Sequence, residues 1–256
     1  MTTKIEWVQN PDGSLGKTWN PITGCTKTSL GCLHCYAERM AKRLAGRHGY
    51  PKDNPFQVTL HPDRLEQPFK WRKPLMIFLC SMSDLFHEDV REDYIFQVIK
   101  IIKKCPQHTF QILTKRSDRM LNISQKIKQW PPNAWLGVTV EAKKYKVRID
   151  HLKQAKASIK FLSCEPLLED LGEIDLDKIN WLIVGGESGP KSRLMRPEWA
   201  TSLRDQCVIK GVPYFFKQWG GKNKKANGRM LEGKVWCQMP IVPSYCSKNE
   251  QMKLAL

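Results

Sequence analysis

Short apolar runs, separated by polar and amphipathic stretches, recur along this chain. The runs are residues 76–80, 109–113, 135–140, 159–163, 181–184 and 213–216, and an earlier strand is expected near residues 16–20. Nearly continuous apolar runs of this length are typical of parallel strands that are buried on both faces. The pattern therefore predicts a parallel sheet with helices packed on it.

Apolar residues at helical spacing lie between these runs. Residues 94–104 repeat isoleucine and valine on one face, residues 144–155 place apolar residues among charges, and residues 197–210 begin with a proline suited to a first turn. Such alternation predicts an α/β fold, either a barrel or an open doubly wound sheet. We expect this domain to span residues 1–220 and a basic C-terminal extension to span residues 221–256.

Polar residues and glycines follow the predicted strands at their carboxyl ends. They are Ser81, Ser83, Asp84, Lys115, Arg116, Glu141, Glu165, Gly185, Gly186, Glu187, Lys217 and Trp219. In both architectures the carboxyl ends of parallel strands meet at one edge, where functional sites lie. The sequence therefore predicts one polar site along that edge, although strands also exit into polar loops without any function.

The chain is strongly basic, with a formal net charge of +17. This charge indicates a polyanionic partner, and nucleic acid is the first candidate. The alternative is a basic surface without a specific partner. No apolar run approaches the ~18 residues that a membrane span needs, and the N-terminus lacks an apolar signal core. We therefore expect a cytoplasmic protein without a membrane partner.

Cysteine usage divides into one cluster and a scattered set. Nine cysteines, an odd number, argue against a disulfide framework. The scattered ones are expected to be small core residues, and they are Cys80, Cys105, Cys164, Cys207, Cys237 and Cys246.

The clustered cysteines are Cys25, Cys32 and Cys35, on a loop directly before a helix-like run. Three thiolates on one loop suit a metal site that keeps one position open, as in an iron–sulfur cluster with one unliganded iron. Zinc is the main alternative, because a structural zinc site needs four ligands. His34 is poorly placed as the fourth ligand, whereas a distant ligand such as His48 stays open.

Residues 18–25 and 31–38 carry motifs that resemble the phage-associated three-cysteine-motif family, which is related to radical S-adenosylmethionine (SAM) enzymes and more distantly to photoproduct lyases. The resemblance extends over roughly residues 5–220 and includes motifs at 81–86, 113–116, 163–167 and 185–189. It implies a partial (β/α)6 TIM-like barrel and a 4Fe–4S cluster held by the three clustered cysteines. SAM would chelate the open iron and be cleaved to a 5′-deoxyadenosyl radical, with electrons from a donor such as flavodoxin or ferredoxin.

One feature departs from the usual radical SAM pattern. Six residues separate Cys25 from Cys32, where three are usual, whereas the second gap keeps two residues. His34 also stands where an aromatic residue is common, and it would pack on the cluster or hydrogen-bond a sulfide. The longer gap still allows one loop to wrap a cluster.

The resemblance also implies roles for individual residues. The cofactor-binding candidates are Tyr36, Ser81, Ser83, Asp84, Glu141, Glu165, Gly185, Gly186 and Glu187. Simpler roles stay open for three of these residues. Asp84 can cap a turn, and Glu141 or Glu165 can form an ion pair with Lys115 or Arg116. Cys164 is a candidate hydrogen donor to a product radical, and Cys80 competes for that role.

Basic residues near the same strand ends are the nucleic-acid candidates. They are Lys115, Arg116, Arg119, Lys191, Arg193, Arg196 and Lys217, together with Trp219 as a stacking platform. The sequence thus predicts a radical SAM enzyme that modifies or repairs nucleic acid, with DNA favoured. The alternatives are a zinc-stabilised nucleic-acid-binding protein, and a radical SAM enzyme with a protein or small-molecule substrate.

Overall fold

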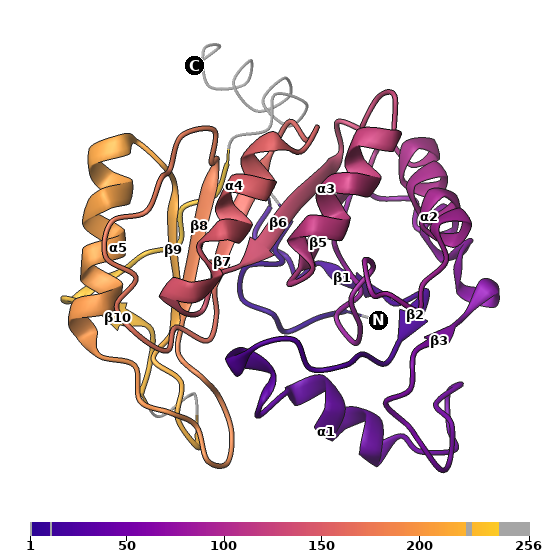
Figure 1. Cartoon of the computed structure of the whole chain (residues 1–256), viewed down its shortest axis with the longest axis horizontal. Helices are drawn as coiled ribbons and strands as arrows, with labels where there is room; N and C mark the ends of the chain where they lie inside the picture. Colours follow the sequence, from indigo (N-terminus) through magenta and orange to yellow (C-terminus); the bar gives the residue numbers. More distant parts are fainter. Residues whose placement is uncertain (1, 11, 224–226, 241–256) are drawn as a thin grey trace.

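A single parallel sheet of seven strands forms the centre of the computed structural model, which describes residues 2–10, 12–223 and 227–240. The strands are β1 (Lys17–Trp19), β4 (Met76–Leu79), β5 (Thr109–Thr114), β6 (Ala134–Thr139), β7 (Lys160–Cys164), β8 (Trp181–Gly185) and β9 (Tyr214–Gln218). They pair in this order, and β1 and β9 form the two edges. The curled sheet is therefore an open half-barrel (Figure 1). The predicted α/β fold with a partial barrel is confirmed.

Among the described residues, four α-helices lie along the outer face of the sheet, and a fifth lies apart from them (Figure 1). The outer helices are α2 (Glu92–Lys104), α3 (Ser117–Lys126), α4 (Val147–Gln154) and α5 (Pro197–Lys210), and α1 (Tyr36–Arg43) follows the cysteine loop. The isoleucines and valine that predicted α2 are all buried, as helical spacing requires. At the end of α5, Gly211 adopts a left-handed conformation with φ of 66°, which favours glycine at this position.

Shorter elements complete the described chain. They are the 3-10 turns η1 (Leu30–Cys32), η2 (Pro62–Arg64), η3 (Gln67–Lys70) and η4 (Lys143–Tyr145), the antiparallel pair β2 (Ile22–Thr23) and β3 (Thr59–Leu60), and the antiparallel pair β10 (Met230–Leu231) and β11 (Lys234–Val235). The turn η4 explains why α4 begins later than the predicted helix. The described part of the C-terminal segment runs beside β9, because the Phe216 amide donates a hydrogen bond to the Trp236 carbonyl. The division at residue 220 stays a prediction.

Alternating side chains on the strands separate two hydrophobic cores. The outer core lies between the sheet and the helices, and the inner core fills the concave side with residues such as Trp135, Phe161 and Trp181. Trp7 enters the inner core from the N-terminal segment and packs edge-on against Phe78, with 4.8 Å between ring centroids. The position of this segment could not be predicted from local sequence, because the interior space that it fills exists only once the sheet is curled.

The scattered cysteines are mostly core residues, as predicted. Cys80, Cys105, Cys164 and Cys207 are buried and free, whereas Cys237 is exposed, so the prediction is wrong there. Cys246 lies outside the described residues. Within the described ranges, no helix combines the length and the apolar composition that crossing a bilayer requires.

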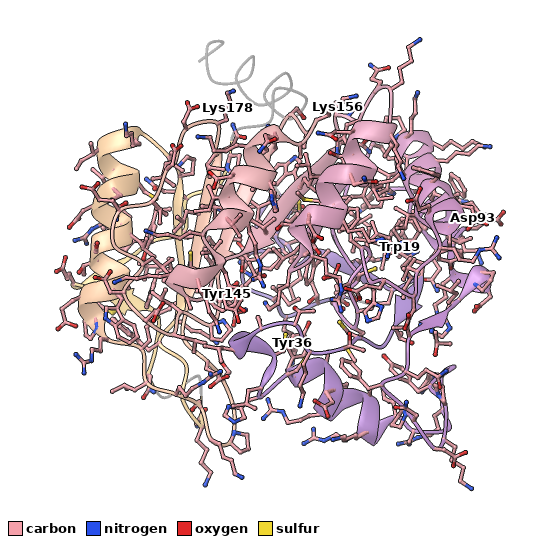
Figure 2. The ribbon with its side chains drawn as sticks, viewed as in Figure 1. Trp19, Tyr36, Asp93, Tyr145, Lys156 and Lys178 are labelled. Atoms are coloured by element: carbon pink, nitrogen blue, oxygen red, sulfur yellow. The ribbon has the colours of Figure 1, made fainter. Side chains whose placement is uncertain are left out.

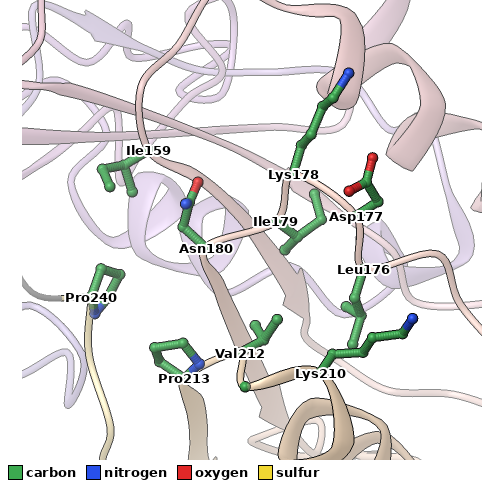
Figure 3. A pocket seen from close by; sticks show the side chains of 11 residues that line it. Ile159, Leu176, Asp177, Lys178, Ile179, Asn180, Lys210, Val212, Pro213 and Pro240 are labelled. Carbon is green, nitrogen blue, oxygen red and sulfur yellow. The ribbon is translucent and has the colours of Figure 1, made fainter.

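A pocket of about 560 Å³ opens at the end of the sheet where β7, β8 and β9 begin (Figure 3). Ile159, Asn180 and Pro213 directly precede these three strands and line it, together with Lys178 and Lys210. Because the predicted site residues follow the strands, this pocket lies at the opposite end of the sheet from them.

Candidate functional site

The cysteine loop begins beside the carboxyl end of β4. Gly24 donates its amide hydrogen to Met82 (3.0 Å), and the Ser83 hydroxyl donates to the Ile22 carbonyl (2.8 Å). Ser81 donates to the Asn20 side chain at 3.2 Å. Both serines are half-buried and hold the loop's first residues against the sheet edge, so each has a structural role besides the predicted cofactor contact.

Arg116 fastens the first cysteine to the end of β5. Its guanidinium lies 3.3 Å from Asp84, 3.5 Å from the Cys25 sulfur and 2.9 Å from the Thr26 hydroxyl. Asp84 is buried and also accepts a hydrogen bond of 2.7 Å from Thr114. Burial, with a smaller contribution from Asp84, raises the pKa of the Cys25 thiol to about 12, and Arg116 opposes this change.

Cys32 has a different electrostatic environment. Burial alone would raise the pKa of its thiol, but Lys115 and a hydrogen bond from Ser29 hold that pKa below its ordinary value. Since the thiolate is the form that binds metal, this environment favours a ligand role. Cys35 lies at the N-cap of α1 and is half-buried and free.

Glu141 supports the middle of the cysteine loop. It is fully buried, pairs with Arg148 at 2.8 Å and accepts a hydrogen bond from Ser29. Gly31 passes so close that a Cβ there would lie 2.9 Å from the carboxylate. The carboxylate therefore supports the loop and pairs with a basic side chain, and its predicted contact with SAM stays a prediction. The sequence analysis missed Arg148, although an arginine within an otherwise apolar helix face is a signal for a buried partner.

Two tyrosines fix the loop and the start of α1 to the site. The backbone amide of Leu30 donates to the Tyr145 hydroxyl (3.0 Å), and the Tyr36 hydroxyl donates to the Ser81 carbonyl. Figure 2 labels both tyrosines, which lie toward the side of the sheet that faces α1. These contacts place the loop across the carboxyl ends of β4, β5 and β6.

His34, Glu187 and Arg193 form a cluster, here called the Glu187 cluster, that ties the loop to the end of β8. Glu187 lies 3.1 Å from the His34 ring and accepts three hydrogen bonds from Arg193, two from its side chain and one from its backbone. Arg193 also donates to the Leu30 carbonyl at 3.0 Å. Glu187 thus holds the loop at the end of β8, and its predicted cofactor contact stays a prediction.

The Glu187 cluster makes the protein sensitive to acid. Burial alone would raise the pKa of Glu187, but Arg193 and His34 lower it from 4.5 to about 2. Because the folded pKa lies below the unfolded one, the stabilisation is complete above pH 4.5 and is lost as the pH falls toward 2. We expect a Glu187→Gln variant to lose less stability than the wild type over this range, by about 2 kcal/mol. Urea unfolding at stepped pH measures this, and parallel curves for the two proteins would contradict it.

Glu165 occupies the mouth of the half-barrel. Its carboxylate accepts hydrogen bonds from the Trp7 indole (3.1 Å) and the Ser163 hydroxyl (3.1 Å), and it pairs with Lys217 at 3.0 Å. A Cβ at Gly185 would lie 2.8 Å from this carboxylate, so a larger residue there would displace the Glu165 side chain. Gly186 likewise packs against the backbone of Trp219. The sequence analysis missed Trp7, because nothing near it in the chain signals a contact 158 residues away.

Cys164 faces the helices and not the mouth. It is completely buried in the outer core, whereas its neighbours Ser163 and Glu165 contact each other on the inner side. Burial, with Cys207 nearby, raises the pKa of the Cys164 thiol well above its ordinary value. The burial of Cys164 favours the alternative role of a small core residue, and the role as hydrogen donor stays a prediction. The competing Cys80 is buried in the same outer core.

The predicted nucleic-acid residues separate into exposed and internal ones. Lys191 and Arg196 are exposed, and Lys115, Lys217 and Trp219 are half-buried. Arg193 belongs to the Glu187 cluster.

Arg116 and Arg119 differ from the prediction. Arg116 is 5% exposed and its guanidinium is used inside the protein, and Arg119 donates to the backbone carbonyls of Phe86, His87 and Val90. Both guanidiniums therefore stabilise the sheet edge, and their predicted contact with nucleic acid stays a prediction.

The donor set of the loop fits a cluster with one open iron, since it offers three free, half-buried thiols. In the described ranges, however, no three His, Cys, Asp or Glu side chains are gathered closely enough to hold a metal ion. The loop therefore offers three free thiols, but they are not gathered into a metal site among the described residues.

Comparisons with known proteins give one family and one kind of solved structure. A family model described as "Protein of unknown function (DUF5131)" matches residues 2–240. No curated protein matches the chain significantly. Three chains of spore photoproduct lyase are similar to it in structure.

A mutant lyase is 13% identical with a TM-score of 0.45, and the match covers 81% of this chain and 76% of the lyase. A second mutant, with bound AdoMet and dinucleoside spore photoproduct, is 12% identical with a TM-score of 0.43 over 77% of this chain. The match spans 61% of that lyase chain.

Proposed function

The chain belongs to the DUF5131 family, and we propose that it is a radical SAM enzyme that acts on nucleic acid. The observation that carries this proposal is the cysteine loop, whose three free thiols lie along the carboxyl ends of parallel strands. This is the edge of an α/β sheet at which active sites are built. The resemblance of the loop motifs to the phage-associated three-cysteine-motif family points the same way.

Cys25, Cys32 and Cys35 would hold the 4Fe–4S cluster. When bound, the reduced cluster supplies one electron that cleaves the sulfonium of SAM, and the protein supplies position and electrostatics. Lys115 favours the Cys32 thiolate, and Arg116 donates to the Cys25 sulfur. A small protein such as flavodoxin or ferredoxin would deliver the electron.

The half-barrel mouth would take SAM and the substrate. Lys217 and Glu165 lie at its inner wall, and their 3.0 Å ion pair offers both a cation and an acceptor to a bound molecule. Trp7 and the inner aromatic core close the space beneath them, which excludes water from that side. Within the proposal, Glu141 and Glu187 position the loop through their ion pairs with Arg148 and Arg193.

Nucleic acid is the proposed substrate, with DNA favoured. The formal net charge of +17 supports a polyanionic partner, and exposed Lys191 and Arg196 lie close in sequence to the Glu187 cluster. The reaction would be a base modification or a lesion repair, in which a target nucleotide leaves the stack to reach the mouth.

Anaerobic reconstitution tests the proposed activity. The chain is loaded with iron and sulfide, then given SAM and dithionite, and 5′-deoxyadenosine is measured by chromatography. We expect 5′-deoxyadenosine from the loaded wild type and none without reductant. A colourless protein that holds zinc and forms no 5′-deoxyadenosine would instead identify a zinc-stabilised binding protein.

A further inference from the structure

Apolar side chains are exposed on both sides of the candidate site. Leu30, Leu33, Tyr36 and Met40, on the cysteine loop and α1, are 41–55% exposed, and Leu194 is 84% exposed. Leu194 is the most exposed large hydrophobic residue among those that the structure describes. We call these five residues the apolar collar.

The two sides of the apolar collar are joined by hydrogen bonds. Arg193, next to Leu194, donates to the Leu30 carbonyl at 3.0 Å. Arg39, on α1, donates to the Ser188 carbonyl at 3.3 Å. Single exposed apolar residues are ordinary on protein surfaces, whereas a group gathered beside a site indicates an interaction surface.

Leu194 is held in an exposed position by its neighbours. Arg193 is fixed by its ion pair with Glu187, with 2.6 Å between nitrogen and oxygen, and Met195 is 2% exposed. The same loop is closed by a hydrogen bond from the Ser192 amide to the Gly189 carbonyl (3.2 Å). A leucine between two anchored residues keeps its position at little entropic cost when it meets a partner.

The charges around Leu194 favour one class of partner. Lys191 and Arg196 flank it in the sequence and are exposed. On the other side of the apolar collar, Lys27 and Lys42 both pair with Glu38, so their charge is partly compensated. A leucine between exposed cations suits a duplex, whose phosphates bind the cations and whose base steps accept an apolar wedge.

We propose that Leu194 is a wedge that enters the base stack of duplex DNA and fills the space of a nucleotide drawn toward the half-barrel mouth. This inference rests on the proposed function, because it assigns the way in which that site reaches its substrate. Partial unstacking by leucine, methionine or phenylalanine is a known means of distorting a duplex. Extrusion of one nucleotide then costs less, since the wedge replaces the lost stacking contact.

Binding of a fluorescein-labelled DNA duplex and of the same strand alone tests the wedge, at fixed salt. We expect Leu194→Ala to weaken duplex binding about tenfold and to change single-strand binding less than about twofold. Leu194→Met should restore duplex binding, because methionine also serves as a wedge. The matched control is Ile209→Ala, which removes an equally exposed apolar residue (80%) at the far end of α5 and should leave both affinities unchanged.

The outcomes separate this inference from the proposed function. The wedge is wrong if Leu194→Ala binds the duplex as tightly as the wild type does. It is also wrong if the substitution weakens duplex and single-strand binding equally, and in both cases nucleic-acid binding stands. If the wild type binds neither probe, both the wedge and the proposed substrate class are wrong. A duplex carrying 2-aminopurine adds a direct signal, since its fluorescence should rise with the wild type and not with Leu194→Ala.

Discussion

A Cys32→Ala variant is expected to bind no cluster iron, whereas the anaerobically reconstituted wild type holds about four iron atoms per chain. The loop offers three thiols, so the loss of one leaves too few ligands to retain a cluster. Cys32 is also the thiol that Lys115 and Ser29 favour as thiolate. Iron and sulfide content after reconstitution and desalting measures this.

The matched control for Cys32→Ala is Cys237→Ala, because Cys237 is exposed and free and lies outside the loop. It should keep the full iron content and the full yield of 5′-deoxyadenosine. Equal iron content in Cys32→Ala and in the wild type would mean that the loop does not carry the metal. Equal loss in both variants would point to a general effect of cysteine removal.

An Arg116→Ala variant is expected to lose about 3 kcal/mol of unfolding free energy, because the substitution leaves the Asp84 carboxylate buried without its charge partner. Asp84 is 5% exposed and keeps only neutral donors such as Thr114. The start of the cysteine loop loses three hydrogen bonds at the same time, two at Thr26 and one at Cys25. The midpoint of urea unfolding on the metal-free chain measures the loss.

Arg196→Ala is the control for this effect, since Arg196 is exposed, and it should change the unfolding free energy by less than about 0.5 kcal/mol. The proposed function also predicts a difference in DNA binding, because Arg196→Ala would lose a phosphate contact. If Arg116→Ala were as stable as the wild type and bound DNA less tightly, Arg116 would belong to the nucleic-acid surface after all.

The strands and the outer helices α2, α4 and α5 could be predicted from sequence because each depends on a local pattern, whereas α3 was not predicted. The runs that became β4 to β9 are apolar on both faces, and α2 repeats its apolar residues at helical spacing. The location of the polar residues at one edge of the sheet could also be predicted, because the carboxyl ends of parallel strands meet there. The orientation of Cys164 could also be predicted from sequence. Phe161, Ser163 and Glu165 alternate with it along the chain and lie on the inner face, so Cys164 lies on the outer face.

Partners across the fold could not be predicted in the same way. Arg116 and Arg196 look alike in the sequence, yet one is buried against Asp84 and the other is exposed. Glu141 and Glu187 both follow strands. They pair with Arg148 and Arg193 because α4 and the loop after β8 fold back over the ends of those strands. The contact between Trp7 and Glu165 depends on the curl of the whole sheet, which no local pattern encodes.

The spectrum of the reduced cluster with and without SAM tests the central claim most directly. Electron paramagnetic resonance of the reconstituted wild type, reduced with dithionite, reports on the iron that lacks a cysteine ligand. We expect a reduced 4Fe–4S signal whose g values shift when SAM is added and stay unchanged when the same volume of buffer is added. A spectrum without any cluster signal, or one that SAM does not alter, would contradict the account.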